Sequence, residues 1–177
     1  MKKKITIIIL ILILLTLTLT LVNISTYKAY HKNYFYMDTY IDIKLNTTKN
    51  RKEMNKIFED IDYLYKSYHE LTDRYNSYNN VINIYYLNEK LPDNEEVEID
   101  PRLSDIINLG IEYYDKTNGL LNIAAGNLTE VWKEFINTCE KLPSNEELNK
   151  NINIKDINLE NNIYKKQNNI KLDLGAI

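Results

Sequence analysis

The sequence predicts an α+β domain in which helices pack on a largely antiparallel sheet, preceded by one transmembrane helix or signal segment. Residues 34–45 and 162–174 alternate apolar and polar side chains, as half-buried strands do. Between them, apolar residues recur at helical spacing in several stretches. The chain begins with a lysine cluster and a long uncharged apolar run. These three observations define the fold class.

The N-terminal segment has the pattern of a membrane anchor. Lys2, Lys3 and Lys4 precede residues 5–22, which carry no charge and would span about 27 Å as a helix. The lysines are expected to stay in the cytoplasm, so the rest of the chain would lie outside the cell membrane. A cleaved signal peptide is the alternative. We therefore predict residues 1–33 as an anchor or signal segment with a polar spacer (23–33), and residues 34–177 as a partial domain.

The first predicted strand and helix adjoin each other. In residues 34–45, Met37 shares one face with every second residue, so that face is expected to be buried. A polar turn at 46–50 follows. From residue 52 to 71 the apolar positions change to helical spacing, which predicts an amphipathic helix.

The next helices are predicted from their end signals. Asp100 suits a helix N-cap and Pro101 the first helical position, while residues 118–119 (Asn-Gly) form a stop signal. A further helix is expected from residue 128 to about residue 139. Ser144 and Glu147 have the spacing of a capping box, which predicts a short helix.

The last stretch, 162–174, predicts two strands joined by a polar turn at 167–169. Its second half brings Asp173 to a strand end, off the apolar face, directly before Gly175. A turn-capping carboxylate and a ligand-binding carboxylate both fit this place. Residues 81–97 fit a helix and a strand equally well.

Composition excludes several functions. The net charge is −3 and no basic block follows the N-terminal lysines, which argues against a nucleic-acid partner. The single cysteine, Cys139, cannot form an internal disulfide. We interpret it, together with His31 and His69, as structural. The chain contains no glycine-rich phosphate loop and no Gly-x-Ser-x-Gly nucleophile motif.

Four stretches in fixed order carry a family resemblance. They are YFYMDTYIDI (34–43), DRYNSYNNVINI (73–84), TNGLLNIAAGNLTEVWKEF (117–135) and IKLDLGAI (170–177), and we call them the four family stretches. Together they resemble the ApbE family of FAD:protein FMN transferases. The resemblance extends from Tyr34 to Ile177. In that family the last stretch lies near the middle of the chain, so the resemblance implies an N-terminal half whose domain is incomplete at its C-terminal side.

The resemblance implies a reaction and its partners. The family moves FMN from FAD to a threonine or serine hydroxyl of an acceptor protein, with AMP leaving, and some members instead hydrolyse FAD. Such chemistry calls for Mg²⁺ at the pyrophosphate and for a flavin-accepting membrane or surface protein as partner. By itself this half is expected to be inactive. A non-catalytic, membrane-anchored remnant that binds FAD or serves a structural role is the second hypothesis.

The resemblance also implies site residues. Leu121 and Asn122 depart from the family pattern, which has phenylalanine and aspartate there, so Asn122 can form hydrogen bonds but supplies no negative charge. The carbonyl of Ala176 matches a position that helps to hold magnesium. Plain core packing is the alternative for Met37, and a structural role is the alternative for Tyr75. The implied FAD-binding residues are Met37, Tyr75, Leu120, Leu121, Asn122 and Asp173.

Overall fold

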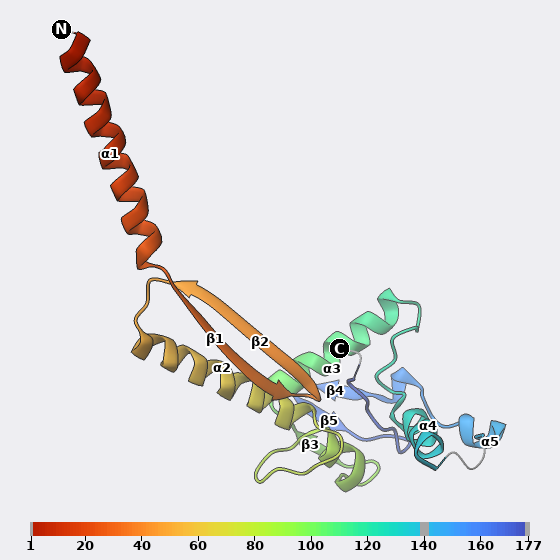
Figure 1. Ribbon diagram of the computed structural model, residues 1–177. Helices are drawn as coiled ribbons and strands as arrows, with labels where there is room; N and C mark the ends of the chain where they lie inside the picture. The colour runs from red at the N-terminus through yellow and green to blue at the C-terminus, as the bar shows by residue number, and fades with distance from the viewer. Residues whose placement is uncertain (1, 139–141, 176–177) are drawn as a thin grey trace. The chain divides into compact units, whose positions relative to one another are not determined.

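The computed structural model describes residues 2–138 and 142–175 (Figure 1). They divide into two compact units, Met1–Lys66 and Ser67–Ile177. Each unit has a core of its own. The α+β class is confirmed, because helices accompany two antiparallel sheets, one in each unit.

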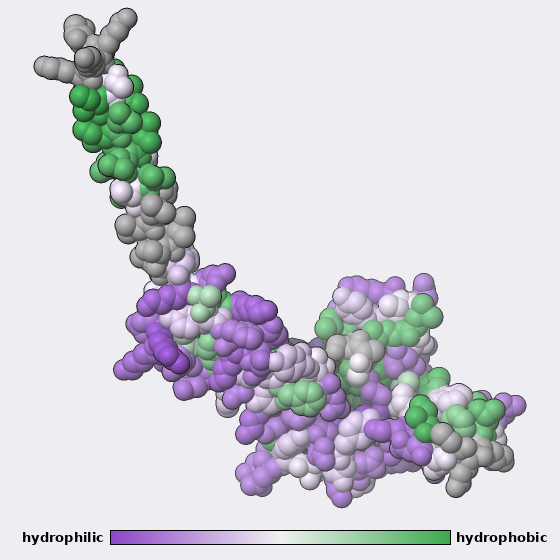
Figure 2. Space-filling view, viewed as in Figure 1, coloured by the Kyte–Doolittle hydropathy of each residue, from purple (hydrophilic) through white to green (hydrophobic). Residues whose placement is uncertain are grey.

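Helix α1 (Lys2–Thr26) opens the first unit. Apolar side chains cover its described surface, and the leucines and isoleucines between Ile5 and Leu19 are all exposed (Figure 2). Within the described residues, the structure contains no helix with both the length and the apolar character needed to span a membrane.

A β-hairpin follows, formed by β1 (Lys28–Tyr36) and β2 (Thr39–Thr47). The strands are antiparallel, and Tyr36 pairs with Thr39 across a two-residue loop. Both loop residues, Met37 and Asp38, have φ of 52°, the left-handed conformation that such tight hairpin loops require. The strand predicted at 34–45 is confirmed at 34–36 and 39–45, but the loop divides it into two strands, and residues 28–33 of the predicted spacer belong to β1. The polar residues from 28 to 33 pair with β2 instead.

Helix α2 (Arg51–Thr72) begins in the first unit and ends in the second, and it confirms the helix predicted at 52–71. Asn50 caps its N-terminus, because the Asn50 side chain accepts hydrogen bonds from the Lys52 and Glu53 amides. Met54 and Phe58 form the core of the first unit with Tyr34 of β1. The helical spacing of these apolar residues thus matches a buried face.

Three further helices lie in the second unit, at α3 (Pro101–Lys116), α4 (Gly126–Thr138) and α5 (Asn145–Leu148). Asp100 caps α3 through the Arg102 amide, and Ser144 and Glu147 form the predicted capping box of α5. The Asn-Gly pair after α3 takes positive φ at both residues, which confirms the stop signal. Helix α4 begins two residues before the predicted start, and Cys139 lies outside the described residues.

The second sheet has the order β3-β5-β4 and is antiparallel throughout. Its strands are β3 (Glu96–Glu98), β4 (Asn158–Glu160) and β5 (Ile163–Lys165). A π-helix (Tyr86–Lys90) precedes β3, so the ambiguous stretch 81–97 contains both helical and strand residues.

The final predicted strand pair is wrong in part. The hairpin joins β4 to β5 through Asn161 and Asn162, both at positive φ, rather than through 167–169. Residues 168 and 169 do form a turn, but 170–174 belong to no assigned strand. The predicted alternation of buried and partly exposed residues nevertheless holds there, since Ile170, Leu172 and Leu174 lie in the core. The core of the second unit comprises Leu71, Ile84, Leu87, Leu91, Ile99, Leu103, Ile107, Ile123, Ala124, Ile157, Tyr164, Ile170, Leu172 and Leu174.

Candidate flavin-binding site

The loop after α2 is ordered by Asp73. Its carboxylate accepts hydrogen bonds from the Tyr75 amide at 2.7 Å, the Asn76 amide at 3.1 Å and the Tyr78 hydroxyl at 2.7 Å. Partial burial raises the pKa of Asp73, but these bonds, with one from the Asn76 side chain, outweigh it and leave the pKa below its ordinary value. Burial and the hydrogen bond that the Tyr78 hydroxyl donates to Asp73 raise the pKa of Tyr78 to about 12. The loop that carries Tyr75 is thus held by an ionised carboxylate.

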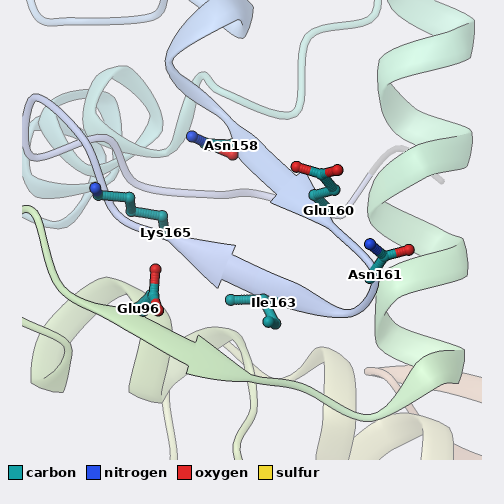
Figure 3. Close-up of a pocket in the computed structure, with 6 residues that line it drawn as sticks. All are labelled: Glu96, Asn158, Glu160, Asn161, Ile163 and Lys165. Atoms are coloured by element: carbon teal, nitrogen blue, oxygen red, sulfur yellow. The ribbon is translucent and has the colours of Figure 1, made fainter.

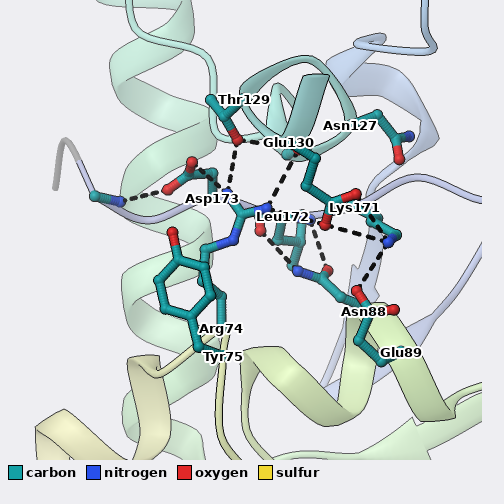
Figure 4. Close-up of polar contacts among 12 residues, drawn as sticks. Arg74, Tyr75, Asn88, Glu89, Asn127, Thr129, Glu130, Lys171, Leu172 and Asp173 are labelled. Atoms are coloured by element: carbon teal, nitrogen blue, oxygen red, sulfur yellow. Dashed lines mark hydrogen bonds and ion pairs between the residues drawn. The ribbon is translucent and has the colours of Figure 1, made fainter. Parts of the chain in front are cut away.

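Arg74 joins this loop to two other segments (Figure 4). Its Nη1 donates to Thr129 Oγ1 at 2.7 Å and to Asp173 Oδ2 at 2.5 Å. Its Nη2 donates to the Gly126 carbonyl at 3.3 Å and to Glu130 Oε1 at 3.2 Å. The Arg74 side chain is only 8% exposed, so these partners must compensate the cost of burying its positive charge.

A second cation extends the same network. Lys171 Nζ lies 2.8 Å from Glu89 Oε1 and 3.0 Å from Glu130 Oε2. Burial lowers the pKa of Lys171, but the hydrogen bonds to the two carboxylates outweigh it and raise the pKa above its ordinary value. Glu130 is thereby shared between Lys171 and Arg74.

The segment that contains Asp173 is held by a buried amide. Asn88 in the π-helix accepts from the Leu172 amide at 2.8 Å and donates to the Leu172 carbonyl at 2.9 Å. The carbonyl of Asn88 accepts from Lys166 Nζ at 2.6 Å, and burial lowers the pKa of this lysine. The Asp173 amide donates to the Ile123 carbonyl at 2.8 Å. These hydrogen bonds therefore fix the backbone at Leu172 and at Asp173.

Asp173 lies where the sequence predicts, off the apolar face, with its side chain 22% exposed. One carboxylate oxygen pairs with Arg74, and the other accepts from the Gly175 amide at 3.0 Å. The Asp173 carboxylate thus forms the ion pair with Arg74 and also stabilises the turn at Gly175. This is the turn-capping role that the sequence left open.

Tyr75 presents its ring to solvent, with 53% of the residue exposed. Lys133 Nζ lies 3.7 Å from the ring centroid, and Arg74 Cζ lies 5.5 Å from it. The ring therefore carries a cation over it and has accessible area for a ligand to stack on.

In the third family stretch, residues 120–125 form the turn that leads into α4. Leu120 is 92% exposed, while Leu121 packs against the core. The Asn122 side chain accepts from the Ala124 amide at 2.9 Å and donates to the Ile152 carbonyl at 2.9 Å. Gly126 donates its amide to the Lys171 carbonyl at 3.0 Å, a close approach that leaves no room for a Cβ atom. Asn122 is thus engaged in shaping the turn before α4.

The comparison with known families decides the family of the chain. A sequence model of the ApbE family matches residues 37–177. The chain belongs to the ApbE family.

Solved structures show the same fold. The chain is similar to the flavinyl transferase ApbE of Pseudomonas stutzeri, with a TM-score of 0.71 and 14% identity over 85% of this chain and 50% of that one. The flavin transferase ApbE of Vibrio cholerae is similar with a TM-score of 0.67 and 18% identity, over 85% of this chain and 49% of that one. The ApbE protein of Thermotoga maritima is similar with a TM-score of 0.65 and 22% identity, over 84% of this chain and 48% of that one. The chain spans about half the length of these proteins. No curated protein sequence matches it.

Three of the four ApbE family stretches meet in the second unit. The contacts of Arg74 and Asp173 join residues 73–84, 117–135 and 170–175 directly. Met37 lies in the first unit, in the hairpin loop and 43% exposed. The prediction that it lies on a buried strand face is wrong, because the two left-handed residues turn the chain there.

The sequence did not single out Arg74, Asn88, Glu130 or Lys171. Arg74 stands inside a family stretch directly before Tyr75, so a charged residue beside a candidate position was the available signal. The role of Asn88 had no such signal, because its partner Leu172 is 84 residues away in the chain.

The described residues do not form a metal site by themselves. Within residues 2–138 and 142–175, no group of three or more histidine, cysteine, aspartate or glutamate side chains is placed to hold an ion. Ala176, the predicted magnesium position, lies outside the described residues. A lone carboxylate such as Asp173, already paired with Arg74, does not fit a complete Mg²⁺ shell.

An open pocket of about 450 Å³ lies elsewhere in the second unit (Figure 3). It is lined by residues of β3, β4, β5 and the turn between β4 and β5, such as Glu96, Glu160 and Lys165. None of the predicted site residues lines it. The arrangement around Arg74 and Tyr75, which joins three family stretches, is therefore the candidate site.

Proposed function

We propose that this chain forms the N-terminal part of an FAD:protein FMN transferase and contributes the surface that binds the flavin dinucleotide. The observation that carries the proposal is the convergence of three family stretches on Arg74, which bonds to Asp173, Thr129 and Gly126. Membership of the ApbE family and the likeness to two flavin transferases support it.

The residues of this chain would bind and orient the substrate. The exposed ring of Tyr75 offers a face on which a flavin or adenine ring stacks. Asp173 and the turn at Gly175 fix the backbone that approaches the ligand. Mg²⁺ would supply positive charge to the pyrophosphate, as phosphoryl transfer requires. We assign it no ligand, because the described residues form no metal site.

The binding half of the proposal is tested by titrating the purified chain with FAD and following flavin fluorescence. We expect saturable binding that Tyr75→Ala weakens about tenfold, since base–aromatic stacking contributes about 1–3 kcal/mol in comparable sites. Absence of saturable binding by the wild-type chain would count against the proposal.

The transfer half is tested on the complete translated product of the gene, incubated with FAD, Mg²⁺ and a threonine-containing acceptor protein. A fluorescent acceptor band on a denaturing gel is the expected result. A known flavin transferase is the positive control, and an acceptor with alanine in place of the threonine is the negative one. Release of AMP without acceptor labelling would indicate FAD hydrolysis instead.

A non-catalytic module that binds FAD is the second candidate. Asn122 favours it, because an amide stands where the family has aspartate and both of its polar atoms bond to the chain. If Asn122→Asp restores transfer to an otherwise inactive complete product while FAD affinity stays the same, the loss of charge explains the inactivity. Transfer by the unmodified product excludes this candidate.

The location of the protein stays a prediction. It rests on the three lysines and the uncharged run at residues 5–22, with the domain and its acceptor protein outside the cytoplasm. Protease digestion of intact cells tests it, because an extracytoplasmic domain is cleaved before the membrane is permeabilised.

A further inference from the structure

Lys133 is a cation placed over an exposed aromatic ring. Its Nζ lies 3.7 Å from the centroid of the Tyr75 ring. Arg74 and Lys171 each pair with two carboxylates in this region. Among the described residues, no carboxylate pairs with Lys133. Its charge is therefore available to a ligand.

The backbone positions of Tyr75 and Lys133 are set by contacts that the ligand would not disturb. Thr129 and Lys133 are four residues apart on α4, so they lie on the same face of the helix. Thr129 accepts a hydrogen bond from Arg74, which shows that this face is directed at the loop of residues 73–75. Asp73 orders that loop through the Tyr75 amide.

The chemistry of the pair selects a ligand with two features. The ring of Tyr75 stacks with a flat aromatic system, and an ammonium group pairs with a phosphate. Arg74 lies near the same ring, but its guanidinium is only 8% exposed and is neutralised by Asp173 and Glu130. Lys133 is thus the cation that can meet an incoming phosphate.

We propose that Tyr75 and Lys133 form a subsite for a phosphorylated aromatic ligand, in which the ring stacks on Tyr75 while Lys133 leaves the ring face and pairs with the phosphate. The inference deepens the proposed function, and it rests on that function for the identity of the ligand as a flavin nucleotide. Lys133 would then distinguish phosphorylated flavins from riboflavin.

The experiment titrates the full chain with FAD, FMN, riboflavin and AMP, using flavin fluorescence for the first three and calorimetry for AMP. We expect Lys133→Gln to weaken FAD and FMN binding about three- to tenfold, because the variant loses the exposed ion pair between Lys133 and the phosphate. Riboflavin has no phosphate, so its affinity should stay unchanged. Tyr75→Ala should weaken all three flavins. Raising the salt concentration should weaken FMN binding to the wild type more than to Lys133→Gln.

The chain offers a matched control in Lys116. Its Nζ lies 5.1 Å from the centroid of the Tyr113 ring on α3, but it also pairs with Glu112 at 2.5 Å. Lys116→Gln removes the same charge from a similar cation–ring pair. It should leave the affinity for all four ligands unchanged.

Each outcome decides the proposal. Equal FMN affinity for the wild type and Lys133→Gln overturns the subsite while leaving the proposed function standing. Binding of AMP that depends on Lys133, without binding of FMN or riboflavin, supports the subsite and overturns the flavin-transfer function. Absence of binding of all four ligands to the wild type overturns both.

Discussion

Asn88 holds Leu172 through both polar atoms of its side-chain amide, as the backbone of a neighbouring strand would. The Leu172 amide donates to Asn88 Oδ1 at 2.8 Å, and Asn88 Nδ2 donates to the Leu172 carbonyl at 2.9 Å (Figure 4). Asn88 is 3% exposed and Leu172 is fully buried. A side chain thus provides the hydrogen bonds that fix the residue next to Asp173.

We expect Asn88→Leu to lower the free energy of unfolding by about 3 kcal/mol. The substitution keeps a side chain of similar size but leaves a buried amide and a buried carbonyl of Leu172 without partners, and each such loss costs about 1–3 kcal/mol. Urea denaturation measures the change. Asn108→Leu on the exposed face of α3 is the control and should change the free energy little. Equal effects of the two substitutions would contradict the role assigned to Asn88.

Arg74 and Arg102 allow a comparison of a buried with an exposed ion pair. Arg74→Met should lower the free energy of unfolding by about 2–3 kcal/mol, because Asp173 loses its 8%-exposed partner and Glu130 keeps only Lys171. Arg102, whose side chain is 39% exposed, pairs with Asp100, and Arg102→Met should cost about 1 kcal/mol or less. Thermal or urea unfolding of both variants measures the difference. A loss for Arg74→Met no larger than that for Arg102→Met would show that the Arg74 contacts are dispensable.

Local signals predicted the helices well. The N-cap at Asp100, the stop at residues 118–119 and the capping box at Ser144 each act within a few residues, so their sequence patterns are sufficient. The hairpin was missed because its loop is Met37-Asp38, without the Asn-Gly or Gly pattern typical of left-handed loop residues. An alternating stretch then continued through the turn without an apparent break.

The site could be predicted only through the family stretches. Arg74 and Asp173 are 99 residues apart, and no local pattern indicates that they form an ion pair. The alternation in 170–174 correctly predicted which side chains are buried. The alternation could not show that the Leu172 backbone bonds to the side chain of Asn88, because alternation indicates burial and not hydrogen bonding.

Gly126 allows α4 to approach the segment that carries Asp173. A Cβ atom at this position would lie 2.5 Å from the Lys171 carbonyl oxygen, which belongs to the backbone and cannot move aside cheaply. Gly126→Ala should therefore lower the free energy of unfolding by about 2 kcal/mol, although alanine favours a helix by about 1 kcal/mol. Asn137→Ala, at an exposed position of the same helix, should raise stability slightly. Stabilisation by Gly126→Ala, measured by urea denaturation, would refute the close approach.

The carboxylate of Asp73 should make stability depend on pH. Its pKa in the folded chain lies below its ordinary value, because hydrogen bonds from Asn76, the Tyr75 amide and Tyr78 outweigh the effect of burial. A depressed pKa stabilises the fold above the unfolded value of about 3.9, and this contribution is lost as pH falls through the folded pKa.

Asp73→Asn should therefore cost about 1 kcal/mol at pH 7, and the gap from the wild type should narrow as pH falls below about 4. Urea denaturation at a series of pH values measures it. Tyr78→Phe removes only one hydrogen bond to Asp73, so it should leave the pKa of Asp73 less depressed and give a shallower acid loss than the wild type. A gap between the wild type and Asp73→Asn that stays constant from pH 7 to pH 3 would show that these hydrogen bonds do not favour the ionised carboxylate, because only a group that binds protons differently in the two states can change stability with pH.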